Sequence, residues 1–182
     1  RESMRSDYRL VARALLDLVP FSSAVDVGCA NAFLLEEFAA AGKEVTGVEL
    51  SPEVVEVLSP EIRHAVLIGD FADLAGRWDL ACCVEVAEHI PPPRSAELVD
   101  IVARIARRWI YFTAAPPGQP GRGHINCRPH DEWLEMFAHR GWETDEPRTA
   151  RLRDTLASLE TAVWLRGNSF LFGRSESEAT LR

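Results

Sequence analysis

The residues best suited to chemistry gather around one glycine near the start of the chain. Asp26 and Gly28 end an apolar run that passes into a helical pattern, which predicts a strand, a tight turn and a helix. Such a turn brings backbone N–H groups and a helix N-terminus close to a ligand. A second apolar run ends in Glu49, whose carboxylate can accept hydrogen bonds from both hydroxyls of a ribose. These residues together predict a nucleoside site.

The turn has too few glycines for a dinucleotide. Of the three glycines in the dinucleotide fingerprint only Gly28 is present, and Ala30 and Ala32 follow it. We therefore expect no pyrophosphate, and a nicotinamide dehydrogenase is disfavoured. Asp26 adds negative charge that faces the pocket, which suits a ligand with an amino group or a sulfonium.

Two carboxylates and an imidazole follow a later apolar run. Glu85 and His89 are four residues apart and Glu88 precedes the histidine, so one helical turn would bring the three together. With His124 as a fourth ligand, they could hold Mg²⁺, Mn²⁺ or Zn²⁺. In the alternative interpretation, Glu85 faces the cofactor, Glu88 is a cap or is solvated, and His89 orients a loop.

His124 is a second candidate for chemistry. It lies in a segment rich in Pro and Gly, residues 115–129, that is longer than a structural connection needs, so we expect a substrate lid there. A histidine in a lid can act as general base for a hydroxyl because its ordinary pKa is near neutrality. The alternative is a loop histidine that binds backbone. A zinc site of His124, Cys127 and His130 would lack a local fourth ligand.

Strands and helices are expected to alternate along the chain and to place these residues at one edge of a sheet. Asp131 is the expected N-cap of the helix after the lid. Strands are predicted at residues 24–27, 44–50 and 65–68, and helices at 9–18, 32–41, 51–60, 95–107, 131–139 and 152–159.

The turn that contains Asp26, Gly28, Ala30 and Ala32, together with Glu49, resembles the class I S-adenosylmethionine-dependent methyltransferases. The first motif of that family is a D-x-G-x-G-x-G turn followed by an acid at the end of the second strand. The family's later landmarks occur in order. Residues 69–71 resemble its adenine-contacting turn after the third strand, residues 78–85 and 109–113 resemble its fourth and fifth strands, and residues 142–144 and 169–172 resemble its final two strands. The resemblance covers most of the chain. It implies an α/β fold: a doubly wound, mostly parallel seven-stranded sheet with an antiparallel last strand and helices on both faces. The residues that it assigns to S-adenosylmethionine are Asp26, Gly28, Cys29, Ala30, Glu49, Leu50, Asp70, Phe71 and Glu85.

Two further segments carry narrower resemblances. Residues 85–89 resemble the E-x-x-E-H motif of the ubiquinone-biosynthesis O-methyltransferases and of the 2′-O-methyltransferases that act on small RNAs, where a divalent metal lies next to the attacking hydroxyl. Residues 123–133 resemble a passage of methyltransferases that include many small-molecule and antibiotic-pathway enzymes. The first resemblance implies a metal held by Glu85, Glu88, His89 and His124.

Length, charge and composition narrow the possible domain organisation, partners and location of the protein. We expect a single domain over residues 1–175, with an N-terminal helix within 1–20, the lid at 115–130 and a frayed tail at 176–182. A net charge of −8 disfavours nucleic acid, and Arg104, Arg107 and Arg108 are expected in the last turn of a helix. No apolar run is long enough for a membrane span, and the four cysteines are expected as free thiols, so a cytoplasmic protein is predicted.

The sequence therefore predicts transfer of a methyl group from S-adenosylmethionine to a small molecule, a hydroxyl oxygen being favoured, with His124 or His89 as the base. Such an enzyme fits the modification of small or secondary metabolites. Methylation of a small amine and RNA 2′-O-methylation remain alternatives, as does an inactive S-adenosylmethionine-binding partner subunit. A homodimer is one way in which the pocket could be completed.

Overall fold

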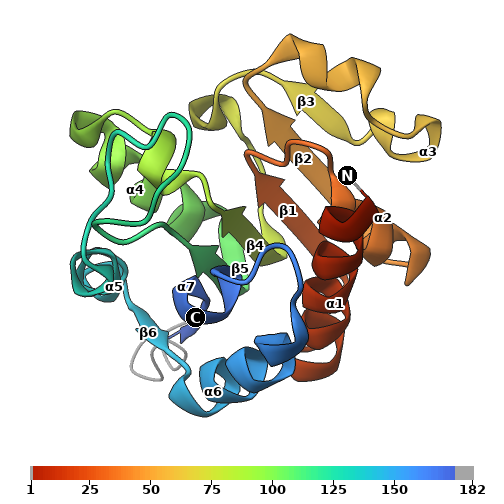
Figure 1. Cartoon of the computed structure of the whole chain (residues 1–182). Coiled ribbons are helices and arrows are strands. Elements are labelled where there is room, and N and C mark those ends of the chain that lie inside the picture. The colour runs from red at the N-terminus through yellow and green to blue at the C-terminus, as the bar shows by residue number, and fades with distance from the viewer. Residues whose placement is uncertain (1, 175–182) are drawn as a thin grey trace.

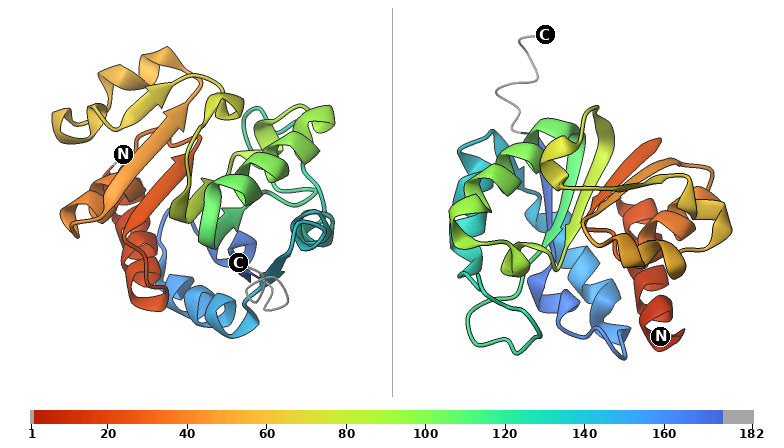
Figure 2. Two further views of the ribbon diagram at one scale, coloured as in Figure 1. Left: turned by 180° about the vertical axis from the view of Figure 1, so that it is seen from behind. Right: turned by 90° about the horizontal axis from the view of Figure 1, so that it is seen from above.

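A computed structural model describes residues 2–174, which form a seven-stranded sheet between two layers of helices (Figures 1 and 2). The sheet order is β3-β2-β1-β4-β5-β7-β6. The strands are β1 (Ser23–Val27), β2 (Glu44–Glu49), β3 (Val66–Ile68), β4 (Trp78–Val84), β5 (Ala106–Thr113), β6 (Trp142–Thr144) and β7 (Phe170–Arg174). The helices are α1 (Glu2–Leu18), α2 (Phe33–Ala40), α3 (Pro60–Arg63), α4 (Ser95–Ile105), α5 (His130–Ala138), α6 (Glu146–Thr155) and α7 (Leu165–Asn168).

The sheet confirms the predicted topology. Strands β1 to β5 pair in parallel, whereas β7 runs antiparallel to both β5 and β6. All five residues of β1 are buried, as is typical of a central strand covered on both faces. The chain reverses its direction of winding between β1 and β4, and ligands of open α/β sheets bind outside the carboxyl ends of the strands at such a point.

Separate apolar cores cover the two faces of the sheet. On one face α1 and α6 pack against β4 and β5, with Leu15 and Leu152 among the buried side chains. On the other face α4 and α5 pack on the same strands through Leu98 and Trp133. Alternation along β4 sends the adjacent cysteines at 82 and 83 to opposite cores, and all four cysteines are free thiols. Within residues 2–174, no helix combines the length and apolar content that a membrane crossing requires.

The predicted helix over residues 51–60 is wrong. A short 3-10 helix, Pro52–Glu56, stands in its place, and Pro60 begins α3 instead of ending a helix. Proline lacks an N–H, so it is tolerated in a first turn and interrupts a continuing one. The Ser51 hydroxyl donates to the Glu53 carboxylate at 2.5 Å and does not cap the helix.

Other boundaries differ from the predicted ones, at the start of a helix or at its end. Helix α1 extends well beyond the predicted 9–18 segment. Helix α4 passes directly into β5 at Ala106, so Arg107 and Arg108 lie in a strand and not in a last helical turn. Asp131 is not the N-cap of α5, because that helix begins one residue earlier, after Pro129.

The segment that joins β5 to α5, residues 114–129, contains no regular element, as predicted for the lid. It is called the 114–129 loop below. The tail predicted at residues 176–182 lies outside the described residues.

Candidate functional site

The largest of three neighbouring cavities, called the largest cavity below, lies at the carboxyl ends of β1, β2 and β4, where the sheet reverses its winding. Its volume is about 530 Å³, and Gly28, Glu49, Asp70, Phe71 and Glu85 contribute to its wall. The structure therefore brings these five predicted cofactor residues from four separate segments to one cavity, whereas Asp26 and Cys29, which were predicted with them, line a neighbouring cavity. Leu50 lies at its edge with 69% of its surface exposed.

The turn after β1 has the conformation of a glycine-rich turn although two of its residues are alanines. Gly28 has φ +71°, and a Cβ at this position would lie 2.6 Å from a methyl group of Val86. Ala30 and Ala32 also have positive φ, of 45° and 55°. This left-handed region costs roughly 1–2 kcal/mol for a residue with a Cβ. The turn therefore holds two alanines in a conformation that glycine adopts more readily.

The Glu49 carboxylate holds the turn in place. Oε2 accepts a hydrogen bond from the Ala30 amide at 3.0 Å, and Oε1 accepts one from the Ser51 amide at 3.0 Å. Each carboxylate oxygen has a second lone pair that can accept another donor. Glu49 can therefore receive both hydroxyls of a ribose while it fixes the turn that would approach the same ligand.

Asp70 and Phe71 form the opposite wall of the cavity together with Arg94. The guanidinium of Arg94 donates to both oxygens of Asp70 at 2.8 Å, and its central carbon lies 4.4 Å from the centre of the Phe71 ring. The hydrogen bonds from Arg94, and next the Ala72 amide, lower the pKa of Asp70 to about 2. Sequence reasoning missed Arg94, because neither its spacing nor its neighbours mark it as part of a site.

Asp26 faces a second cavity, of about 250 Å³, on the other side of the turn. Its side chain is buried, and Oδ1 has no hydrogen-bond partner among the described residues. Burial, and secondarily the charge of Glu49, raises the pKa of Asp26 to about 8. Tyr8 of α1 contributes to the same cavity, and burial followed by the charge of Asp26 raises the pKa of its phenol. A buried acid without a partner is suited to a cationic ligand group.

Glu85 stands at the junction of the cavities. It follows β4 directly with φ +52°, and its amide donates to the Thr113 hydroxyl at 2.8 Å. The carboxylate accepts hydrogen bonds from Gln119 at 3.3 Å and from Asn168 at 3.1 Å. Sequence reasoning did not foresee these two partners, which belong to the 114–129 loop and to α7.

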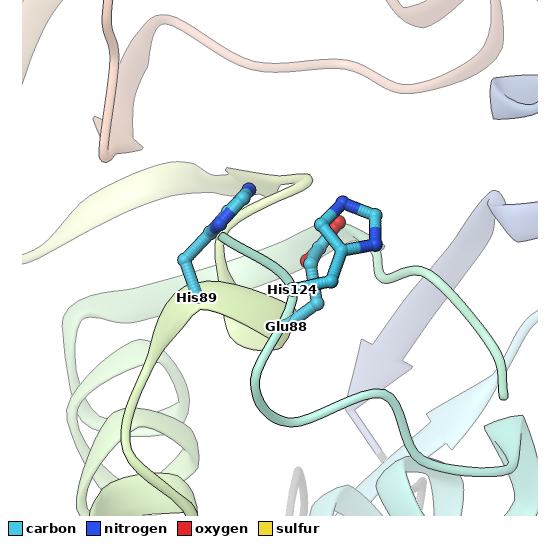
Figure 3. Close-up of side chains that lie close together, drawn as sticks. All are labelled: Glu88, His89 and His124. Carbon is cyan, nitrogen blue, oxygen red and sulfur yellow. The ribbon is translucent and has the colours of Figure 1, made fainter. Parts of the chain in front are cut away.

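Glu88, His89 and His124 form a group of possible metal ligands, one atom of each lying within 4.8 Å of the others. Figure 3 shows Glu88 and His89 on one helical turn, with His124 on the neighbouring loop. The turn is the 3-10 helix Ala87–His89. The centres of the two imidazole rings are 5.1 Å apart. Glu85, the fourth ligand expected from the sequence, is not a member of this group.

The buried Glu88 carboxylate has no hydrogen bond of normal geometry among residues 2–174. Burial, and secondarily the charge of Glu85, raises the pKa of Glu88 to about 7, although the Ala115 backbone acts in the opposite direction. The backbone carbonyl of Glu88 accepts the amides of Ile125 and Asn126, at 2.9 and 3.0 Å, which fixes the loop beside it. A buried acid that lacks a partner is what a bound cation would satisfy.

Backbone carbonyls orient both imidazoles. His89 Nδ1 lies 3.0 Å from the Gly123 carbonyl, and His124 Nδ1 lies 3.2 Å from the Gln119 carbonyl. Because a carbonyl only accepts, Nδ1 carries the proton in each ring, and Nε2 of a neutral ring keeps its lone pair. A Cβ at Gly121 would collide with the His124 ring. The glycine therefore makes room for this histidine.

Neither Cys127 nor His130 completes a zinc site. Sγ of Cys127 lies 3.6 Å from Nδ1 of His124, whereas Nε2 of His130 lies 3.0 Å from the Ala114 carbonyl and its ring packs on Phe170. His130 is therefore directed into a backbone and aromatic environment.

A third cavity, of about 280 Å³, lies between these ligands and the 114–129 loop. Met4 and Tyr8 of α1, Trp164, and Glu88 and His124 contribute to its wall. Glu85 also lines it, and so does His89, which faces the largest cavity as well. An acceptor in this cavity would therefore lie next to a nucleoside in the largest one.

The fold, the glycine turn and the acid at the end of β2 are those of a class I S-adenosylmethionine-dependent methyltransferase. Residues 2–113 match the family described as "Methyltransferase domain", and this match spans more than half of the sequence. The chain belongs to this family of methyltransferases.

Two relatives are similar in sequence to this chain, one over most of its length and one over about half of it. A ubiquinone biosynthesis O-methyltransferase of Xanthomonas oryzae is 29% identical over 173 residues, 90% of this chain and 66% of that protein. One of Bordetella parapertussis is 32% identical over 100 residues, 49% of this chain and 41% of that protein. The chain thus spans less than two thirds of the length of either relative.

Among solved structures, magnesium protoporphyrin IX methyltransferase from Synechocystis with bound SAH has a TM-score of 0.69 at 18% identity, covering 95% of this chain and 84% of that one. The sugar N-methyltransferase KedS8 from Streptoalloteichus has a TM-score of 0.68 at 17% identity, covering 93% and 87%. At these identities the likeness concerns the fold.

Proposed function

We propose that this chain transfers the methyl group of S-adenosylmethionine to a hydroxyl oxygen of a small molecule. The observation that carries the proposal is the contact between Glu49 and the Ala30 amide, which joins the acid after β2 to the turn after β1 beside the largest cavity. Family membership supports methyl transfer, and the relatives named as O-methyltransferases support oxygen as the acceptor atom.

The cofactor would lie across the turn, with its adenosine in the largest cavity. Glu49 would accept the ribose hydroxyls, and Asp70 and Phe71 would border the adenine. The methionine ammonium would lie near Asp26, whose buried carboxyl oxygen lacks a partner. The sulfonium would then lie near Glu85, where the cavities meet.

The acceptor would occupy the third cavity, under the 114–129 loop as its lid. In the transfer, the acceptor O–H bond gives up its proton, an oxygen lone pair forms the new O–CH₃ bond, and the CH₃–S bond breaks. Its electrons leave with sulfur, which becomes the neutral thioether of S-adenosylhomocysteine. The enzyme has to hold oxygen, carbon and sulfur in line and to remove the proton.

His89 and His124 are the proposed proton acceptors. Each ring binds a backbone carbonyl through Nδ1, so Nε2 can take a proton in the cavity. His89 lines both the cofactor cavity and the acceptor cavity, which makes it the better placed of the two. For an amine that reacts as its free base, both histidines would serve only to position the acceptor.

As an alternative to the role of His89 and His124 as proton acceptors, the residues around His124 fit a divalent metal. Glu88, His89 and His124 would hold it, since their ligand atoms cluster and the buried Glu88 carboxylate lacks a partner. A bound divalent ion lowers the pKa of an adjacent hydroxyl and so supplies the activated oxygen at neutral pH. Glu85, the fourth ligand expected from the sequence, would need to turn away from Gln119 and Asn168 to join.

A net charge of −8 favours a small acceptor over a nucleic acid, because a phosphate backbone would be repelled. Among the described residues, Arg122 is the one arginine or lysine that lines the acceptor cavity. We also propose that residues 1–175 form a single methyltransferase domain.

Isothermal titration calorimetry with S-adenosylmethionine and S-adenosylhomocysteine tests the cofactor site. We expect micromolar binding that Glu49→Gln weakens at least about tenfold, because the neutral amide offers one acceptor atom instead of two. Glu143→Gln, an exposed acid on β6, is the matched control and should bind normally. Absence of binding to the intact protein would refute the proposal. Labelled S-adenosylmethionine with panels of phenols, alcohols and amines then tests the acceptor atom.

A further inference from the structure

Asn168 joins a distant part of the chain to the centre of the site. Its buried side chain lies on the last residue of α7, and Nδ2 donates to Glu85 Oε1 at 3.1 Å and to Gln119 Oε1 at 3.0 Å. Gln119 Nε2 donates in turn to Glu85 Oε2 at 3.3 Å. These contacts close a ring of three side chains, the Glu85–Gln119–Asn168 triad.

The donor directions in the triad follow from chemistry. A carboxylate only accepts, so the NH₂ group of each amide must face Glu85. The oxygen of Gln119 is then left to accept the second N–H of Asn168. Each oxygen of Glu85 receives one hydrogen bond, and such bonds to a charged group are stronger than those between neutral groups.

Glu85 is the side chain through which the triad acts on the site. Among the described residues it alone lines all three cavities, those assigned above to adenosine, to the ammonium and to the acceptor. Its backbone is held at φ +52°, and its amide is bound to Thr113. With the backbone fixed, the side-chain donors at 119 and 168 determine where the carboxylate points.

We infer that Asn168 and Gln119 are positioning residues that couple the place of the 114–129 loop to the orientation of the Glu85 carboxylate. If the loop moves away, Gln119 leaves and Glu85 loses the donor to Oε2. If α7 moves, both partners of Asn168 are released. Asn168 lies outside the matched family segment, residues 2–113. The inference rests on the proposed function for the meaning of the site, but the contacts can be tested without it.

Coupling of this kind is reciprocal. A ligand that binds against the oriented Glu85 carboxylate also stabilises the loop position that supplies Gln119. S-adenosylhomocysteine, if it binds as proposed, should therefore protect the loop, and removal of a triad donor should abolish the protection. A role limited to packing would not produce this dependence on ligand.

Trypsin provides a direct reporter of the loop. Arg122 is exposed, and the bond to Gly123 is the trypsin-sensitive bond of the 114–129 loop, since Arg128 is followed by proline. Cleavage at this bond, followed by mass spectrometry under native conditions, measures how often the loop opens. The other cleavage sites of the chain serve as internal references.

We expect Gln119→Ala to raise the initial rate of cleavage at the reporter bond about tenfold, which corresponds to loss of one hydrogen bond to a charged group. Asn168→Asp, similar in shape but with a carboxylate facing Glu85, should do the same. The double variant should be little faster than either single variant, because both release the same unit. Thr155→Ala removes an exposed hydrogen bond in α6 and should leave the rate unchanged.

Unchanged cleavage in Gln119→Ala, a half-buried loop position where misfolding is not expected, would overturn the inference, and so would strictly additive effects in the double variant. Faster cleavage in the variants supports the contacts of the triad, and protection by S-adenosylhomocysteine that either variant abolishes supports the coupling. S-adenosylhomocysteine that binds to the unaltered protein without slowing cleavage would overturn the coupling. If the ligand has no effect on the unaltered protein and does not bind, the proposed function fails while the triad stands.

Discussion

Arg94 holds the carboxylate of Asp70 through two parallel hydrogen bonds of 2.8 Å each. The two residues come from different elements, the turn after β3 and the segment before α4. A bidentate pair fixes the orientation of the carboxylate as well as its distance, which a single hydrogen bond would not do. The same guanidinium covers the Phe71 ring, so one side chain positions two residues of the wall of the largest cavity.

Replacement of this arginine should weaken cofactor binding. Arg94→Gln removes the pair of hydrogen bonds to Asp70 and the cation that lies over the Phe71 ring. We therefore expect the Kd for S-adenosylhomocysteine to rise about tenfold. Calorimetry measures the change. Arg140→Gln is the control, since Arg140 pairs with Asp100 away from the cavity. Equal affinities for the Arg94 variant and the unaltered protein would contradict a positioning role.

Because two alanines of the turn have a left-handed backbone, we expect replacement of Ala30 by glycine to stabilise the protein. Ala30 is exposed at φ 45°, so Ala30→Gly relieves strain but adds freedom to the unfolded chain. The net effect should raise the free energy of unfolding by up to about 1 kcal/mol in urea denaturation. Ala39→Gly in α2, where the backbone is helical, should lower it by about 1 kcal/mol. A loss of stability in Ala30→Gly would show that the turn is not strained.

The strands and the turn could be predicted because their signals are local. The apolar run of β1, the break at Gly28 and the acid at Glu49 are each visible within a few residues. Arg94 and Asn168 could not be found this way, because their partners lie 24 and 83 residues away in the chain. A single sequence shows which residues can do chemistry but not which long-range contacts orient them.

The candidate metal ligands illustrate the same limit. Local spacing on one helical turn was enough to group Glu88 with His89. Glu85 was expected beside them; its backbone is left-handed, its carboxylate is bound by Gln119 and Asn168, and it is not one of the three clustered ligands. Neither feature has a counterpart in the hydrophobic pattern.

Asp26 predicts an unusual dependence of stability on pH. Its pKa is raised to about 8 in the folded protein, from an ordinary value of 3.8, so between these values the folded state binds the extra proton. Stability should therefore fall as pH rises through this window, by at most about 1.4 kcal/mol per pH unit. In Asp26→Asn this contribution is absent. Urea denaturation from pH 5 to 8 should show the unaltered protein losing stability relative to the variant, and parallel curves would contradict the raised pKa.

Metal binding should be visible as a stability change before any acceptor is known. At a Mn²⁺ concentration 100 times the Kd, a single site adds about 2.7 kcal/mol, which raises the Tm by several degrees. We expect His124→Ala and Glu88→Gln to abolish the shift in a thermal denaturation series. His139→Ala, an exposed histidine just after α5, should keep it. A shift that survives both ligand variants would place the ion elsewhere.

Glu85 gives the sharper test of the metal group. If the ion is held by the clustered ligand atoms of Glu88, His89 and His124, Glu85→Gln should reduce the Mn²⁺ shift much less than Glu88→Gln does. The reason is geometric, because the carboxylate of Glu85 is already bound by Gln119 and Asn168. An equal loss in both variants would mean that Glu85 leaves these amides to bind the ion. In that case Mn²⁺ should also accelerate trypsin cleavage in the 114–129 loop, since Gln119 would lose its partner.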